Sequence, residues 1–225
     1  MPADPRPTTH DPRDNQPSVF PHAKPFLGWL AVIGAVCGIF QLYWLAGVCT
    51  ALFLYVIYFF RAPRPRPPDD PRAILAPAHG TVADIVDCDE SSFIKGSTRR
   101  VGIFLSIFDV HVQACPADAA IKWTEYRPGK FLDARDPDCS AQNECQWLGF
   151  ESRDGFRYTV KLIAGLIARR IVLWRPKDTP LRRGDRISLI RFGSRVEIFL
   201  PKNTEVLVKV GDRVKGGESI VARRT

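Results

Sequence analysis

The stretch RFGSRVEIFL, residues 191–200, decides the fold of the C-terminal part of the chain. From Val196 onward its apolar residues occupy every second position, which is the period of a half-buried β-strand. The dipeptide Gly193-Ser194 stands just before that strand and by itself is an ordinary turn signal. The stretch therefore predicts a tight turn that runs directly into a strand, near the end of a chain of 225 residues.

The same strand period recurs through residues 73–225. The runs TVADIV (81–86) and VLVKV (206–210) alternate in the same way, and Asp154-Gly155 is typical of a hairpin turn. Helical signal is sparse in this part of the chain. We expect a mainly β domain, that is, a β-rich α+β fold.

Two segments of this domain resemble the strand-turn-strand units of lipoyl- and biotinyl-carrier folds, namely APAHGTVADIV (76–86) and VKVGDRVKGGESIV (208–221). Those carriers attach a cofactor to a lysine in a tight hairpin, often flanked by methionine. The only methionine here is Met1, and no such hairpin lysine stands out. We therefore expect a barrel-sandwich-like shape without a swinging arm.

A long apolar run precedes the β-rich part. Residues 26–60 contain no charged side chain. A single helix of that length would measure about 52 Å, whereas about 20 residues suffice to cross a bilayer. Two helices that turn near residues 41–43 fit better, and the alternative is a hairpin buried in a protein core. The run is too long and starts too late for a cleaved signal peptide.

Charge and composition favour a membrane as the partner. Both flanks of the apolar run are basic, which places both ends on the cytoplasmic side of the cell membrane. Residues 1–25 have the composition of a disordered tail, and 61–72 form a basic, proline-rich linker. The net charge of +8 favours an anionic membrane, since no nucleic-acid-binding motif is present. The six cysteines form no C-x-x-C pair, so metal and disulfide frameworks are poorly supported.

Seven segments resemble, in order, those of phosphatidylserine decarboxylases, particularly the short form of that family. They are FFRAP (59–63), APAHG (76–80), IFLSIFDVHV (103–112), YRPGKF (126–131), NE (143–144), IAGLIARRIV (163–172) and RFGSRV (191–196). Each segment alone is a weak signal, but the ordered set is highly specific.

The resemblance implies self-cleavage between Gly193 and Ser194. In such a cleavage the serine hydroxyl attacks the preceding carbonyl, the amide becomes an ester, and elimination leaves a pyruvoyl group. A β chain (1–193) and an α chain (194–225) would stay together as a heterodimer, with further self-association into a homo-oligomer left open. The pyruvoyl group would form a Schiff base with phosphatidylserine and act as an electron sink while phosphatidylethanolamine is made.

Two histidines are candidate catalytic residues. His111 matches the family's Asp-x-His segment and is our candidate general acid, since its ordinary pKa is near 6.5. In a strand, Asp109 would face the same side and orient the imidazole; alternatively it is a turn residue. His79 stands where the family usually has Asp, and we hypothesise that it is the general base that activates Ser194. Ala114 stands where long-form members carry a second histidine.

Three further segments, and the function itself, have alternative interpretations. Gly165 would allow a close backbone approach. Arg169 or Arg170 would meet a phosphate or carboxylate, or remain solvated. Pro128-Gly129 reads as a turn, which the resemblance places loosely near the substrate entrance. The alternative function is an uncleaved, non-catalytic, membrane-tethered barrel-sandwich binding module.

Overall fold

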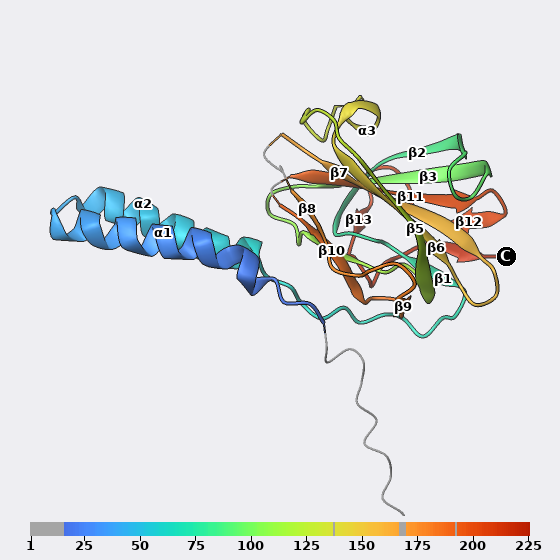
Figure 1. Cartoon of the computed structure of the whole chain (residues 1–225), viewed down its shortest axis with the longest axis horizontal. Coiled ribbons are helices and arrows are strands. Elements are labelled where there is room, and N and C mark those ends of the chain that lie inside the picture. Colours follow the sequence, from blue (N-terminus) through green and yellow to red (C-terminus); the bar gives the residue numbers. More distant parts are fainter. Residues whose placement is uncertain (1–15, 137, 167–169, 192) are drawn as a thin grey trace, which may run out of the picture.

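A computed structural model describes residues 16–136, 138–166, 170–191 and 193–225, and two N-terminal helices project from its β-rich body (Figure 1). Helix α1 spans Phe20–Ile39 and helix α2 spans Tyr43–Phe59. Gln41 connects them in the left-handed region at φ 58°, which reverses the chain. Helix α1 is long and apolar enough to cross a membrane, and α2 is a shorter apolar helix of 17 residues.

Helix α1 begins earlier than the sequence predicted. Residues 20–25, which we expected in the disordered tail, form its first turns. Pro21 lies in the first turn, where a helix needs no N–H donor. Ala23 is buried against the β-rich body, so tertiary packing holds this end of the helix in place. Residues 1–15 of the expected tail lie outside the described residues.

Three antiparallel sheets make up the body. The largest has the strand order β13-β2-β3-β11-β7-β6-β5-β9, and the smaller sheets are β1-β14-β12 and β4-β10-β8. Their bounds are β1 Ala73–Leu75, β2 Gly80–Glu90, β3 Gly96–Leu105, β4 Val112–Ala114, β5 Ala119–Arg127, β6 Cys145–Glu151, β7 Arg157–Ala164, β8 Ile171–Leu173, β9 Pro180–Leu181, β10 Arg186–Ile190, β11 Ser194–Pro201, β12 Thr204–Val206, β13 Arg213–Val214 and β14 Ile220–Arg224. A short helix, α3, spans Cys139–Gln142. The expectation of a mainly β fold with an N-terminal helical hairpin is confirmed.

Strand β11 occupies the centre of the large sheet, between β3 and β7. Its residues are buried from Ser194 to Leu200, on both faces. The expectation of a half-buried strand was wrong here, because Arg195 and Glu197, which suggested a solvent face, pair with each other inside the protein at 2.8 Å. The run 206–210 was also wrong as a strand, since β12 ends at Val206 and the chain then turns.

The two carrier-like segments lie side by side. Strand β13 pairs with β2, with Arg213 opposite Thr81 and Val214 opposite Gly80. The linker 61–72 also packs on this region, since a Cβ on Gly217 would lie 2.8 Å from the Cβ of Pro65.

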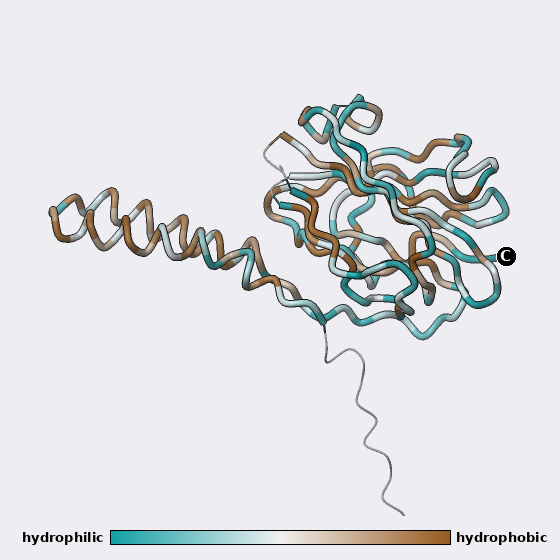
Figure 2. The backbone as a smooth tube through the Cα atoms, in the orientation of Figure 1, coloured by the Kyte–Doolittle hydropathy of each residue, from teal (hydrophilic) through white to brown (hydrophobic). Residues whose placement is uncertain are grey.

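The base of the hairpin packs on the body through a cluster of its own. Val56, Phe59 and Phe60 are buried with Val112 and Leu189 of strands β4 and β10. Beyond this base the helices carry exposed apolar side chains along their length. The hydropathy colours of Figure 2 show the apolar character of both helices in brown. The hairpin is therefore fixed to the β4-β10-β8 sheet at one end and presents an apolar surface at the other.

Candidate active site

Ser194 is the first residue of β11 and lies in the middle of the large sheet. It pairs with Leu105 of β3 on one side and with Ala164 of β7 on the other. Its side chain is fully buried, and its Oγ has no hydrogen-bond partner among the described residues. An unpaired buried hydroxyl is energetically costly, and no hydrogen bond to a described residue holds the Oγ of Ser194 away from the neighbouring Gly193 carbonyl. Phe192 of the cleavage segment lies outside the described residues.

Gly193 is held in a left-handed conformation, with φ at +67°. Its N–H donates a hydrogen bond to Nε2 of His111 at 3.1 Å. A Cβ on Gly165 would lie only 2.3 Å from the carbonyl oxygen of Gly193. The close backbone approach expected at Gly165 is therefore confirmed, and the group it approaches is the carbonyl of the Gly-Ser bond.

His111 is fully buried, and its two ring nitrogens have different partners. Because Nε2 accepts from Gly193, the ring proton is on Nδ1, which donates to the backbone oxygen of Asp109 at 2.9 Å. Burial lowers the pKa of His111 to about 4, so the imidazole is neutral near pH 7. The ring of Phe59, from the end of α2, lies against it with centroids 4.3 Å apart. The structure therefore brings a neutral imidazole to the Gly-Ser turn.

The carboxylate of Asp109 does not orient His111. It accepts hydrogen bonds from the backbone N–H of Ser106 at 2.8 Å and from Arg213 at 2.6 Å. Residues 106–110 form a turn rather than the strand assumed in the prediction, so the side chains of positions 109 and 111 do not share a face. The turn alternative was right, and the imidazole is oriented by the backbone carbonyl of Asp109 instead.

His79 lies directly before β2, partly exposed. Burial lowers its pKa, while the charges of Asp109 and Glu218 act in the opposite direction. Among the described residues it has no hydrogen bond to Gly193 or Ser194. Of the two predicted histidines, His111 is hydrogen-bonded to the Gly193-Ser194 dipeptide that the sequence analysis predicts to be cleaved, and His79 is not.

A buried ionic network fixes β11 behind the serine. Arg195 pairs with Glu197 at 2.8 Å and also contacts Asp84 of β2. Arg100 of β3 reaches Asp84 at 3.2 Å. These pairs link β2, β3 and β11, so the start of β11 has little freedom to move.

The other predicted site residues lie around this centre. Arg170 is exposed at the start of β8, and Arg169 lies outside the described residues. Gly129 follows β5 and approaches the backbone of Asn143 so closely that a Cβ there would lie 2.5 Å from it. The amide of Asn143 bonds the backbone oxygen of Ala164 at 2.8 Å, beside Ser194. No turn is assigned at residues 128–129, so the turn prediction there stays a prediction.

No individual sequence signal pointed to Phe59 as a neighbour of His111. Its position at the end of an apolar run explains a membrane role equally well, and only the packing of the hairpin base on the body reveals the contact. The same holds for Arg213, whose partner Asp109 is 104 residues away in the chain.

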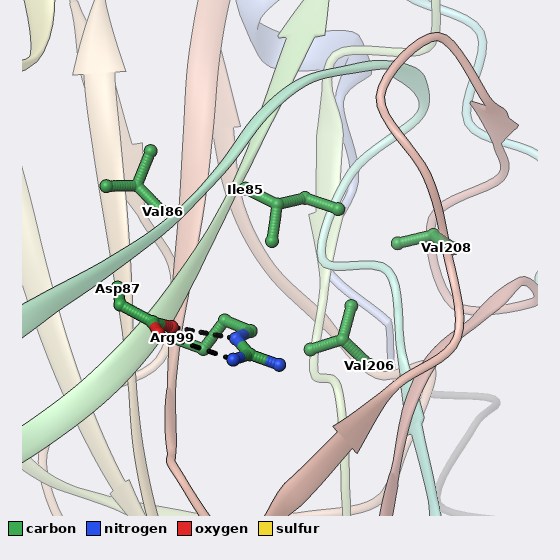
Figure 3. Close-up of a pocket in the computed structure, with 6 residues that line it drawn as sticks. All are labelled: Ile85, Val86, Asp87, Arg99, Val206 and Val208. Atoms are coloured by element: carbon green, nitrogen blue, oxygen red, sulfur yellow. Dashed lines mark hydrogen bonds and ion pairs between the residues drawn. The ribbon is translucent and has the colours of Figure 1, made fainter.

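A surface groove, shown in Figure 3, is lined by four apolar side chains and one ion pair, namely Ile85, Val86, Val206, Val208 and the Asp87–Arg99 pair. The register of β3 and β11 places Arg99 opposite Leu200 and Leu105 opposite Ser194. The groove therefore lies six residues, roughly 20 Å, along the strand from the serine. It is not part of the candidate active site.

Fold and site together define a class: a mainly β protein with an apolar helical hairpin, whose buried serine follows a left-handed glycine next to a neutral histidine. That arrangement suits a proenzyme that acts on its own backbone. The family model for phosphatidylserine decarboxylase matches residues 52–222, and this chain belongs to that family.

Three relatives with the name phosphatidylserine decarboxylase proenzyme illustrate the match. The protein from Carboxydothermus hydrogenoformans is 42% identical over 198 residues, which is 88% of this chain and 91% of the relative. The protein from Symbiobacterium thermophilum is 41% identical over 209 residues, 92% of this chain and 96% of the relative. The protein from Geotalea daltonii is 37% identical over 215 residues, 95% of this chain and 100% of the relative.

Proposed function

We propose that this chain is a membrane-bound phosphatidylserine decarboxylase that makes phosphatidylethanolamine with a pyruvoyl group formed from Ser194. The observation that carries the proposal is the buried, unpartnered hydroxyl of Ser194 directly after a left-handed Gly193 whose N–H is bonded to His111. Family membership supports an enzyme, so the uncleaved binding module is not proposed.

The cleavage step needs a base and a fixed carbonyl. The Oγ of Ser194 adds to the carbonyl carbon of Gly193 while its proton passes to Nε2 of His111. The C–N bond then breaks, and the same proton returns to the nitrogen, which leaves an ester. A neutral histidine within hydrogen-bond reach of the turn suits this base role. We therefore favour His111 over His79 as the base.

Ester elimination completes the group. Loss of the α-proton of Ser194 breaks the ester C–O bond, frees the carboxylate of Gly193 and leaves a dehydroalanine. Its enamine tautomerises, one water molecule replaces the nitrogen, and ammonia departs with the pyruvoyl group in place. The position fits the group, because it is enclosed between β3 and β7 and shielded from bulk water.

The finished group supplies an electrophilic carbonyl for the substrate amine and an electron sink for the decarboxylation. Nε2 of His111, the atom that acts as the base in cleavage, then has a second role. A neutral Nε2 accepts a proton from the substrate ammonium and returns one to the α-carbon after carbon dioxide leaves. Phe59, 1% exposed, covers this imidazole and limits the access of water to it.

The α chain of residues 194–225 would remain bound after cleavage. It contributes β11 to the centre of the large sheet, β13 to its edge beside β2, and β14 between β1 and β12. Strand pairing of this extent holds the two chains together without a covalent link.

The hairpin would place the site at the cytoplasmic surface of the cell membrane, as the basic flanks of the apolar run suggest. Leu30 is the last residue of α1 that belongs to the cluster at the hairpin base. The part from residue 31 to the turn at Gln41 therefore reaches only about 17 Å, less than the roughly 30 Å hydrocarbon core. We infer that the hairpin dips into the bilayer and returns.

The exposed side chain of Phe108 supports this placement. It lies in the turn whose backbone oxygens accept from the hydroxyls of Tyr55 and Tyr58 at 3.1 Å, beside the hairpin base. An exposed phenylalanine at this level suits contact with lipid.

Denaturing electrophoresis and mass spectrometry of the full chain test the proposal. We expect a 32-residue fragment (194–225 of 225 residues) that begins with pyruvoyl, and conversion of phosphatidylserine to phosphatidylethanolamine. Ser194→Ala should stay uncleaved and inactive. A parent chain that stays intact would contradict the proposal.

A further inference from the structure

Two arginines meet at the end of the small sheet that supports the hairpin. Strands β8 and β10 are antiparallel, and their last pair is Ile171 opposite Ile190. Arg170 precedes Ile171 and Arg191 follows Ile190, so the two arginines continue the register of these strands, and the charge of Arg170 acts on Arg191. Like charges in this position repel each other and destabilise a sheet unless something compensates.

No carboxylate compensates them among the residues that the structure describes. Arg191 has one side-chain hydrogen-bond partner there, Nδ1 of His22 at 3.4 Å, and its Nε is buried without a partner. Burial lowers the pKa of Arg191, and the nearby charge of Arg170 lowers it further. Two neighbouring cations, one of which has a buried Nε–H that no described residue accepts, form a site suited to an anion.

The position of this pair relates it to the proposed reaction. The N–H of Ile190 donates to the backbone oxygen of His111 at 3.2 Å, and the N–H of Gly193 donates to the imidazole of the same residue. In the chain, Arg191 stands between Ile190 and Gly193, the two residues that make these contacts. In a phosphatidylserine headgroup the phosphorus is only three covalent bonds from the α-carbon that loses carbon dioxide. A phosphate-binding group must therefore lie very near Ser194, as Arg191 does.

The pair also lies at the level of the hairpin base. His22 is in the first turn of α1, and its ring is 6.2 Å from that of Trp174, just after β8. Val172 of β8 and Leu189 of β10 pack in the hairpin-base cluster. An anion at the two arginines would thus be reached from the lipid surface along the hairpin.

We propose that Arg170 and Arg191 bind the phosphodiester of the aminophospholipid substrate, an inference that rests on the proposed function. Guanidinium forks match phosphate oxygens in a bidentate manner, and the anion relieves the repulsion between the two side chains. The two arginines bind the phosphodiester, while the pyruvoyl group formed from Ser194 reacts with the amine of the same lipid.

Binding is measured in the full-length Ser194→Ala chain in neutral detergent micelles, so the outcome does not depend on self-cleavage. The probes for calorimetric titration are dihexanoyl phosphatidylserine, dihexanoylglycerol, which lacks the phosphate, and inorganic phosphate. Arg170→Gln and Arg191→Gln are compared with Arg153→Gln. Arg153 is an exposed arginine in the turn between β6 and β7, at the far end of β7 from Ala164.

We expect each of the two variants to weaken phosphatidylserine binding roughly tenfold or more, because each removes charge-assisted hydrogen bonds. Arg153→Gln should bind like the parent, and dihexanoylglycerol binding should not depend on the arginines. Arg191→Lys should recover part of the affinity. In the cleaved enzyme, Arg170→Gln should raise KM with little change in kcat.

Unchanged phosphatidylserine affinity in Arg170→Gln and Arg191→Gln would overturn the proposal. Inorganic phosphate that binds as tightly as the lipid would also overturn it, since the site would then serve free phosphate. Should Arg191→Gln fail to fold, the exposed Arg170 decides the matter alone. A failure of the proposed function itself looks different, because the parent chain would then neither cleave nor decarboxylate.

Discussion

The pH dependence of self-cleavage tests the role of His111 directly. The perturbation is a change of pH between about 4 and 8 on full-length chain synthesised in vitro into detergent micelles. Burial holds the pKa of His111 at about 4, against an ordinary value of 6.5. At pH 5 an ordinary histidine would be neutral in only about 3% of molecules, whereas His111 would be neutral in about 90%. Cleavage at pH 5 should therefore be roughly thirty times faster than an ordinary histidine base allows.

The assay follows the 32-residue fragment over time by denaturing electrophoresis. We expect a rate that is level from about pH 8 to 5 and falls only near pH 4. A rate that is half-maximal near pH 6.5 would refute the assignment of a buried, neutral His111 as the base. His111→Gln should abolish cleavage, and His79→Ala should cleave as fast as the parent with the same acid limb. Loss of cleavage in His79→Ala would return the base role to His79.

Stability needs a control in the same experiment. The folded-state pKa of His111 lies below its unfolded value, so the unfolded chain binds the extra proton first as pH falls. The contribution of His111 to the free energy of unfolding is thus fully present above about pH 6.5. It is lost progressively as the pH falls to about 4, by about 3 kcal/mol in all. Unfolding of Ser194→Ala, followed by near-ultraviolet circular dichroism, shows at which pH the fold itself fails.

Three further predictions follow from the packing. Gly165→Ala should slow cleavage about tenfold or more, since the new Cβ would displace the carbonyl of Gly193. Gly96→Ala should not slow cleavage, because a Cβ at Gly96 has no neighbour within 4 Å. Equal rates in the two variants would disprove the contact. Glu197→Ala should lower the free energy of unfolding by about 3 kcal/mol in urea titration, while Asp87→Ala at an exposed pair should change it little. Similar losses would contradict a buried network. A cysteine at Gln41 should resist water-soluble thiol reagents from both sides of a vesicle, and labelling from the side opposite the catalytic domain would show that the hairpin spans.

Much of the fold was accessible from the sequence, for identifiable physical reasons. The uncharged run 26–60 fitted two helices better than one, and the turn at Gln41 lies where the prediction put it. The period of two around Val196 predicted β11 correctly as a strand. It failed to predict how deeply the strand is buried, because Arg195 and Glu197 satisfy each other inside the protein. Periodicity reports polarity, and it does not report whether a charge has a buried partner.

The candidate site was predictable in its residues and less so in its geometry. The sequence predicted Gly193-Ser194 as the cleavage dipeptide and His111 as a catalytic residue, and the structure places these residues in contact. The assumption of a strand at Asp109 was wrong, since a Ser106–Asp109 turn uses the carboxylate elsewhere. Contacts between distant segments, such as Phe59 on His111, depend on how the hairpin docks on the body. No local pattern encodes that docking.

The most direct test of the central claim is the mass of the C-terminal fragment from the freshly purified full chain. The account predicts a fragment of residues 194–225 whose first residue carries pyruvoyl in place of serine, and no such fragment from Ser194→Ala. An intact chain, or a fragment that begins with an unmodified serine, would contradict it.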